Sequence, residues 1–282
     1  MSVMTELRPR GAGAGARGRS GGRAVFAREA HMLAPLAEAA AALCSGLSGD
    51  PQVFFEVPLA AGVPDMVVVT FDAAVMEARQ VAGLGPVTDV SAVRTLVGLG
   101  AGATGVDDLA VAAGLSAGHL RRTVLPSLSD AGWVERVGGK DVVLLHPVRP
   151  VVSWAVAVEA KRSAWAQAVS QAHRMLPAAD RVFVALDAAR AGRAVGNAKH
   201  LASLGVGLAT VEAEPAFGAC QVAVVSSPMA GRPGLPRGHR APKLAAKVLL
   251  GERVWELELA GRRHGPTQLV FGRDLSTGAG QS

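Results

Sequence analysis

Three residues in two short stretches have the chemical types that metal-assisted phosphodiester hydrolysis needs. Asp65 follows Pro64 directly before an apolar stretch, and Glu159 and Lys161 flank Ala160 at the end of a second one. Alternate residues of a strand share a face, so Glu159 and Lys161 are expected to point the same way. Carboxylates supply the hard oxygen ligands that Mg²⁺ or Mn²⁺ prefers, and a nearby lysine can stabilise charge on a phosphate. A divalent-cation site is therefore expected if the two stretches meet.

The alternative for Glu159 and Lys161 is an ion pair on the surface of an edge strand. Their neighbours Trp154, Val156 and Val158 are expected to point the opposite way, into a core. This pattern favours a central strand, on which an unpaired charge would be costly. Small alanines on the charged face are expected to leave room around the pair.

The elements that must position these residues follow an α/β pattern. Apolar runs bounded by turn residues predict strands, and longer stretches with one apolar face predict helices. The predicted helices span 25–43 and 163–176, and the predicted strands span 53–59, 66–71, 154–160, 181–186, 207–211 and 221–226. Beyond these, a short helix near 244–250 and an irregular end are expected. The result is a compact α/β core split by a long insertion.

The insertion has a helical pattern of its own. It predicts helices over Ser91–Leu99, Val106–Ala113 and Ala117–Leu128, and short strands over Val134–Arg136 and Val142–Leu145. Gly114 suits the C-cap of the second helix and Ser116 the N-cap of the third. The run from Asp108 to Ser116, with Leu128 and Gly132-Trp133-Val134, resembles the winged helix-turn-helix of bacterial regulators.

This resemblance, over about 90–147, implies that the third helix enters the major groove of DNA. The DNA-binding residues that it implies are Ser116, His119, Arg121 and Arg122 on that helix and Lys140 on the wing. Arginine can contact guanine edges or phosphate, and lysine can contact phosphate. The alternative is a module that only mediates protein contacts, with its arginines solvated.

The stretches that carry the charged residues resemble the PD-(D/E)xK nuclease superfamily. Pro64-Asp65 matches its first half and Glu159-Ala160-Lys161 its second. The resemblance implies that Asp65, Glu159 and the Ala160 carbonyl bind the metal and that Lys161 is the catalytic lysine. Further residues that it implies are a glutamine on the following helix (Gln171, or Gln167 one turn earlier) and another acid (Glu38 or Glu29 on the first helix, or Glu56 on the first strand).

The implied fold is a restriction-endonuclease-like α/β core, a central mixed sheet flanked by helices, interrupted by a winged-helix insertion. The expected divisions are a disordered basic tail over 1–23, core over 24–72, insertion over 73–150, core over 151–227, and a basic Gly/Pro-rich loop with a C-terminal extension over 228–282. Asp65 and Glu159 are far apart in the sequence, so both ends of the insertion must lie at one hairpin tip.

Composition and charge narrow the class of protein. The net charge of +6 is compatible with nucleic acid. No apolar run has the length of a membrane span and no signal peptide is recognisable, which favours a cytoplasmic protein. The two cysteines lie in apolar surroundings without metal-ligand spacing, so buried free thiols are expected. DNA is the expected partner, a membrane is not, and a homodimer stays open.

The sequence thus predicts a magnesium-dependent deoxyribonuclease, an endonuclease that binds DNA through a winged helix and hydrolyses phosphodiester bonds. The first alternative is a non-catalytic transcriptional regulator that keeps a relic nuclease fold, and the second is a protein-interaction scaffold. The glycine-rich stretch Gly98–Gly102 follows a predicted helix and lacks a terminal Lys-Ser/Thr. This context excludes a dinucleotide-binding loop or a P-loop.

Overall fold

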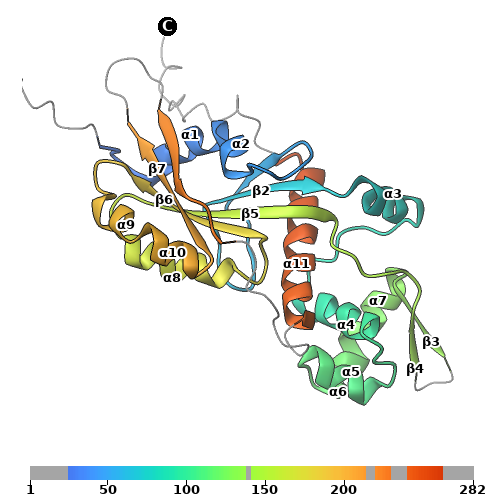
Figure 1. The fold of residues 1–282 in the computed structure, drawn as a ribbon. Helices are drawn as coiled ribbons and strands as arrows, with labels where there is room; N and C mark the ends of the chain where they lie inside the picture. The colour runs from blue at the N-terminus through green and yellow to red at the C-terminus, as the bar shows by residue number, and fades with distance from the viewer. Residues whose placement is uncertain (1–24, 138–140, 214–219, 230–239, 263–282) are drawn as a thin grey trace, which may run out of the picture.

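A mixed six-stranded sheet forms the centre of the computed structural model (Figure 1). The structure describes residues 25–137, 141–213, 220–229 and 240–262. The strand order is β1-β2-β5-β6-β7-β8. Strands β5, β6 and β7 are parallel, and the other neighbours are antiparallel. The strands are β1 (Gln52–Phe55), β2 (Met66–Phe71), β5 (Val152–Lys161), β6 (Arg181–Asp187), β7 (Val206–Glu212) and β8 (Gln221–Ser226).

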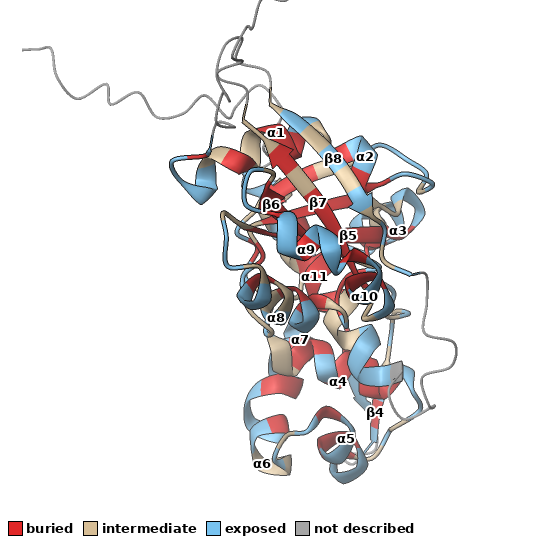
Figure 2. Cartoon of the chain, turned by 60° about the vertical axis from the view of Figure 1, so that its left-hand side comes forward, coloured by how far each residue is buried: buried red, intermediate tan, exposed pale blue. Residues whose placement is uncertain are grey.

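Helices cover both faces of this sheet, which makes the protein an α/β fold. One face packs against η1 (Glu29–Met32), α1 (Leu33–Glu38) and α2 (Ala40–Leu43). The other packs against α8 (Trp165–Met175), α9 (Gly192–Gly196), α10 (Ala198–Ser203) and α11 (Arg240–Leu259). Figure 2 shows the central strands buried between these layers. The expectation of open space around the alanines of β5 is therefore wrong, because Ala155 and Ala157 are buried in the core that includes α8.

Two elements near the N-terminus are shorter than the sequence predicts. The helix expected over 25–43 is three short pieces. The ring of Pro35 would clash with the carbonyl one turn earlier in a continuous α-helix, which separates η1 from α1, and a second break at Ala39 separates α1 from α2. The strand expected over 53–59 ends at Phe55. Glu56 follows in the left-handed region with φ 50°, and such a residue cannot continue an extended strand.

The insertion between β2 and β5 has its own hydrophobic core. Its elements are α3 (Ala73–Val81), α4 (Val90–Gly100), α5 (Val106–Ala113), the continuous helical run α6 (Ala117–His119), η2 (Leu120–Val124) and α7 (Leu125–Asp130), and the hairpin β3 (Val134–Val137) and β4 (Asp141–Leu144). The expected caps are present: Gly114 has φ 67°, and Ser116 Oγ accepts from His119 N at 3.2 Å. The wide turn η2 precedes Pro126, which has no N–H to continue the helical pattern.

Both ends of the insertion leave the sheet at the same place. The amide of Asp72 donates to the carbonyl of Val151 over 2.8 Å, directly after β2 and directly before β5. The insertion therefore extends a hairpin whose two strands stay paired, as the distant positions of Asp65 and Glu159 require.

Helix α11 is much longer than the predicted segment 244–250. It spans 20 residues, because it packs against two partners at once. Leu250, Val254 and Trp255 belong to the core of the sheet, while Val248 and Leu249 pack against α4. Gly251 interrupts the apolar pattern, but a Cβ there would lie 3.1 Å from a Val151 methyl group, so the close approach favours glycine. Among the helices described, none combines the length and apolar character needed to cross a membrane.

A buried arginine on α3 links the insertion to α11. Arg79 forms an ion pair with Glu252, and the two side chains are 6% and 2% exposed. Its guanidinium also lies 4.6 Å from the ring centroids of both Trp133 and Trp255. Glu252 accepts a second hydrogen bond, 2.7 Å long, from Val87 N. We call these residues the arginine joint; every charge in it has a partner, as burial demands.

Candidate functional site

Asp65, Glu159 and Lys161 lie together at one end of the paired strands β2 and β5. Met66 pairs with Val158, which places Asp65 beside the end of β5. Lys161 Nζ lies 2.8 Å from Glu159 Oε1 and 3.7 Å from Asp65 Oδ2. The amide of Ala160 donates to Asp65 Oδ2 at 2.7 Å and thereby holds this carboxylate in place. The two stretches that the sequence singled out are therefore neighbours in space.

Glu29 is a third acid at the same place. Its Oε2 lies 3.4 Å from Lys161 Nζ, and its Oε1 accepts from Arg162 N at 3.3 Å. Glu29 is the first residue of η1, at the N-terminal end of the helical segment. Glu38 closes α1 at the other end of that segment and is exposed, and within the described residues it makes no contact with Asp65, Glu159 or Lys161. Of the two acids predicted on the first helix, Glu29 therefore lies at the site beside Lys161 and Glu38 does not.

Glu56 does not join the acids either, although its backbone lies beside Asp65. The amide of Glu56 donates to the carbonyl of Asp65 at 3.4 Å. Its side chain is exposed, and the structure gives it no interaction with Asp65, Glu159 or Lys161. The physical reason is the left-handed backbone at Glu56, which ends the strand on which the sequence had placed it.

Asp187 is a positioning residue that sequence reasoning missed. It ends β6, is fully buried, and accepts from Phe26 N at 3.1 Å and from Ala189 N at 3.0 Å. The first of these bonds fixes the chain three residues before Glu29 against the sheet. The sequence signal that could have identified it is an acid at the end of the apolar run of β6. A buried carboxylate at that position needs hydrogen-bond donors, which here are backbone amides.

The charges around Lys161 determine how it can act. Burial raises the pKa of Glu159, against the opposing effect of its hydrogen bond with Lys161. Burial alone would lower the pKa of Lys161, but the hydrogen bond to Glu159 and the charges of Asp65, Glu159 and Glu29 raise it. Lys161 is therefore an ammonium at neutral pH. In that state it can stabilise negative charge, and it cannot accept a proton as a base.

The oxygen atoms around Lys161 suit a hard divalent cation. Asp65 Oδ2, Glu159 Oε1 and the Ala160 carbonyl converge on one ammonium, with the carbonyl 3.1 Å from Nζ. Within the described ranges, no group of three or more His, Cys, Asp or Glu side chains is arranged to hold a metal. A set of two carboxylates and one carbonyl remains. Mg²⁺ commonly binds through one or two carboxylates and keeps several waters, so this donor set fits it.

The glutamines on α8 are less closely tied to these residues. Gln171 Oε1 is buried and has no hydrogen-bond partner in the described part of the chain, whereas Gln167 is exposed. The structure gives neither a contact with Asp65, Glu159 or Lys161. A buried oxygen without a hydrogen-bond partner is uncommon in a folded protein, so Gln171 is the better candidate of the two for contact with a ligand.

The residues predicted to bind DNA lie on the insertion. His119, Arg121 and Arg122 are exposed on the helical run that begins after Ser116, and Ser116 itself serves as the N-cap. Arg121 forms an ion pair with Asp107 of α5 over 2.9 Å, in which both side chains are exposed. Lys140 lies outside the described residues, as does the basic tail over 1–23.

The acidic site and the exposed helix are well separated. Asp65 precedes β2, whereas the insertion leaves after Phe71, and six residues of strand span about 20 Å. Figures 1 and 2 both show α5 and α6 at one end of the molecule and α1 near the other. A ligand that contacted both places would have to extend along the molecule.

Comparison with known protein families, with characterised proteins and with solved structures finds no significant match to this chain. The assignment of a function therefore depends on the geometry of the site itself.

Proposed function

We propose that this protein is a magnesium-dependent DNA endonuclease with a restriction-endonuclease-like core and an inserted winged helix. One observation carries the proposal: at one end of the paired strands β2 and β5, oxygen atoms of Asp65, Glu159 and the Ala160 carbonyl all lie around the ammonium of Lys161. The buried Glu159, paired with a largely buried Lys161 at the end of a central strand, is costly to maintain for stability alone. The mixed sheet with helices on both faces is compatible with this core.

In this proposal Asp65, Glu159 and the Ala160 carbonyl hold Mg²⁺ or Mn²⁺. The bound cation would polarise the phosphate and lower the pKa of a bound water. Lys161 keeps its proton and stabilises the negative charge of the phosphate as the bond to water forms. Glu29 pairs with Lys161 and orients its ammonium, and Asp187 holds the segment that carries Glu29.

The insertion supplies DNA binding in this proposal. Helix α5 and the helical run that begins with α6 meet through the turn at Gly114, and the hairpin of β3 and β4 follows that run, which is the order of a winged helix-turn-helix. His119, Arg121 and Arg122 are the exposed side chains available to contact bases and phosphates.

Cleavage of supercoiled plasmid tests the catalytic part. Wild type with Mg²⁺ or Mn²⁺ should nick the plasmid, and EDTA should stop the reaction. Lys161→Ala and Glu159→Gln should lower the rate at least about a hundredfold, as is usual when a transition-state charge partner is lost. Arg174→Gln, an exposed substitution on α8 away from the acids, should cut at the wild-type rate. Equal nicking by wild type and Lys161→Ala would refute the catalytic role.

A non-catalytic DNA-binding regulator is the second candidate. The separation of about 20 Å between the acids and the insertion favours it, since DNA can bind the exposed helix without reaching the acids. This candidate predicts tight DNA binding in EDTA and no cleavage with any divalent cation. Loss of binding in Arg122→Gln, without cleavage by wild type, would support it over the endonuclease.

A further inference from the structure

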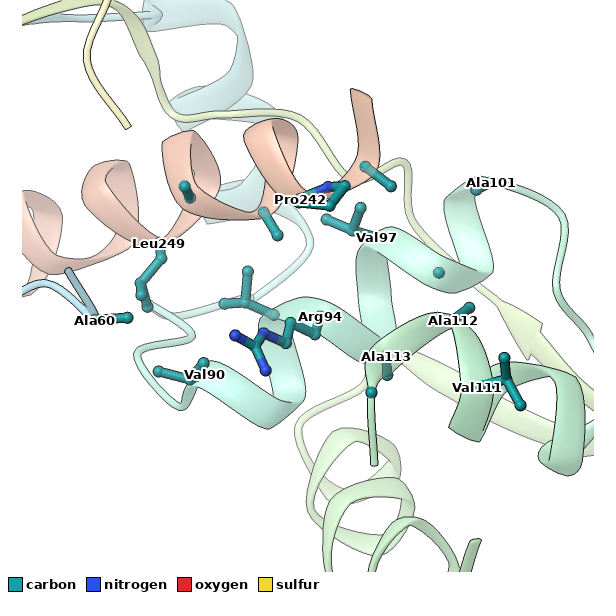
Figure 3. Close-up of a pocket in the computed structure, with 16 residues that line it drawn as sticks. Ala60, Val90, Arg94, Val97, Ala101, Val111, Ala112, Ala113, Pro242 and Leu249 are labelled. Carbon is teal, nitrogen blue, oxygen red and sulfur yellow. The ribbon is translucent and has the colours of Figure 1, made fainter. Parts of the chain in front are cut away.

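A groove lies between α4 of the insertion and α11, as Figure 3 shows. Its volume is about 350 Å³. The walls are almost entirely apolar and formed by small side chains. They include Val90 and Val97 of α4, Ala101 directly after it, Ala245 and Leu249 of α11, and Ala60. The small residues leave space beside the contact of α4 with α11 that Val97 and Leu249 form. Binding sites for small molecules usually have this size and apolar character, with a few polar groups for orientation.

Arg94 is the charged residue that lines this groove. It is exposed on α4, and Figure 3 shows its guanidinium between Val90 and the helix that carries Leu249. None of the lining residues is acidic. Within the described ranges the structure assigns Arg94 no ion pair, while the acidic Glu252 of α11 is engaged by Arg79. The groove therefore combines an apolar wall with one cation that lacks an anionic partner there.

We propose that this groove binds a small amphipathic carboxylate, of the chemical class of a medium-chain fatty acid. Its carboxylate pairs with Arg94, whose planar guanidinium accepts a carboxylate through two parallel hydrogen bonds. Its alkyl chain lies against the alanine, valine and leucine side chains of α4 and α11 and gains from leaving water. This site is independent of the acids around Lys161 and of any nuclease activity.

The groove lies where the insertion meets the part of the chain that packs on the sheet. α4 belongs to the insertion, α11 packs on the sheet, and Ala60 lies in the loop that leads to Asp65. A ligand that contacts all three stabilises one arrangement of the insertion relative to the sheet. It can shift an equilibrium between arrangements only by its difference in affinity for them.

Calorimetric titration with sodium decanoate below its micelle concentration tests the proposal on the full chain. Wild type should bind one decanoate. Arg94→Gln, a surface change that keeps the fold, should weaken binding about tenfold, the equivalent of one charge-assisted hydrogen bond. Ala245→Phe, which fills the groove, should abolish binding, and Arg174→Gln should leave it unchanged. Decanol, which lacks the charge, should bind wild type and Arg94→Gln equally.

Three results would overturn the proposal. The first is the absence of saturable decanoate binding to folded wild type. The second is equal decanoate affinity in wild type and Arg94→Gln. The third is full binding by Ala245→Phe, once circular dichroism has shown that this variant is folded.

Discussion

The arginine joint offers a quantitative test of how the insertion is attached to the sheet. Glu252→Leu should lower the free energy of unfolding by about 3–5 kcal/mol, because it leaves the charge of Arg79 buried without an anion. Arg79→Leu should cost a similar amount by leaving Glu252 alone. The double variant removes both charges together and leaves only Val87 N and the Gly85 carbonyl without their partners, so it should cost only about 1–3 kcal/mol. It should therefore be more stable than either single variant.

Urea unfolding followed by circular dichroism measures these differences, with the four proteins forming a double-mutant cycle. Glu256→Gln is the matched control on the same helix. Glu256 forms an exposed ion pair with Arg253 over 3.2 Å, and loss of such a pair should cost less than about 1 kcal/mol. If the double variant lost the sum of the two single losses, the two side chains would not be coupled and the account of the joint would be refuted.

Three further outcomes are expected. Asp107→Asn frees Arg121 and removes a negative charge beside the exposed helix, so affinity for duplex DNA by fluorescence anisotropy at low salt should rise up to about fivefold; an unchanged affinity would argue against DNA contact by this helix. Burial raises the pKa of the Cys44 thiol to about 11, although Arg181 opposes this, so its alkylation by iodoacetamide at pH 8 should be about a hundredfold slower than that of a thiol at the ordinary pKa of 9.0; equal rates would contradict the burial. Gly207→Ala places a Cβ 2.4 Å from the Phe183 ring and should lower the free energy of unfolding, measured by thermal denaturation, by about 1–3 kcal/mol. Gly196→Ala meets nothing within 4 Å and should lower it by less than about 1 kcal/mol.

Much of the sheet could be predicted from sequence because its strands are short apolar runs between turn residues. β2 and β8 have the predicted bounds, and helix α5 of the insertion does as well. The pairing of β2 with β5 was predicted only through the resemblance to a nuclease family. Pairing of strands separated by a long insertion leaves no local signal, because it depends on contacts between distant residues.

The errors arose where tertiary packing overrides local pattern. Helix α11 has no single apolar stripe in its sequence, because some of its apolar residues pack against α4 and others against the sheet. Its charged residue Glu252 is also buried. The choice between Glu29 and Glu38 depended on which end of a broken helical segment meets β5. The bond from Phe26 to Asp187 decides this, and it joins residues far apart in the sequence.

Binding of Mn²⁺, measured by electron paramagnetic resonance on the full chain, tests the central claim most directly. The account predicts one Mn²⁺ per chain for wild type and loss of this site in Asp65→Asn and in Glu159→Gln. Lys161→Ala should keep the site, because its ammonium is a neighbour of the cation and not a ligand. Absence of stoichiometric Mn²⁺ in wild type, or unchanged binding in both carboxylate variants, would contradict the claim that these two acids share a metal.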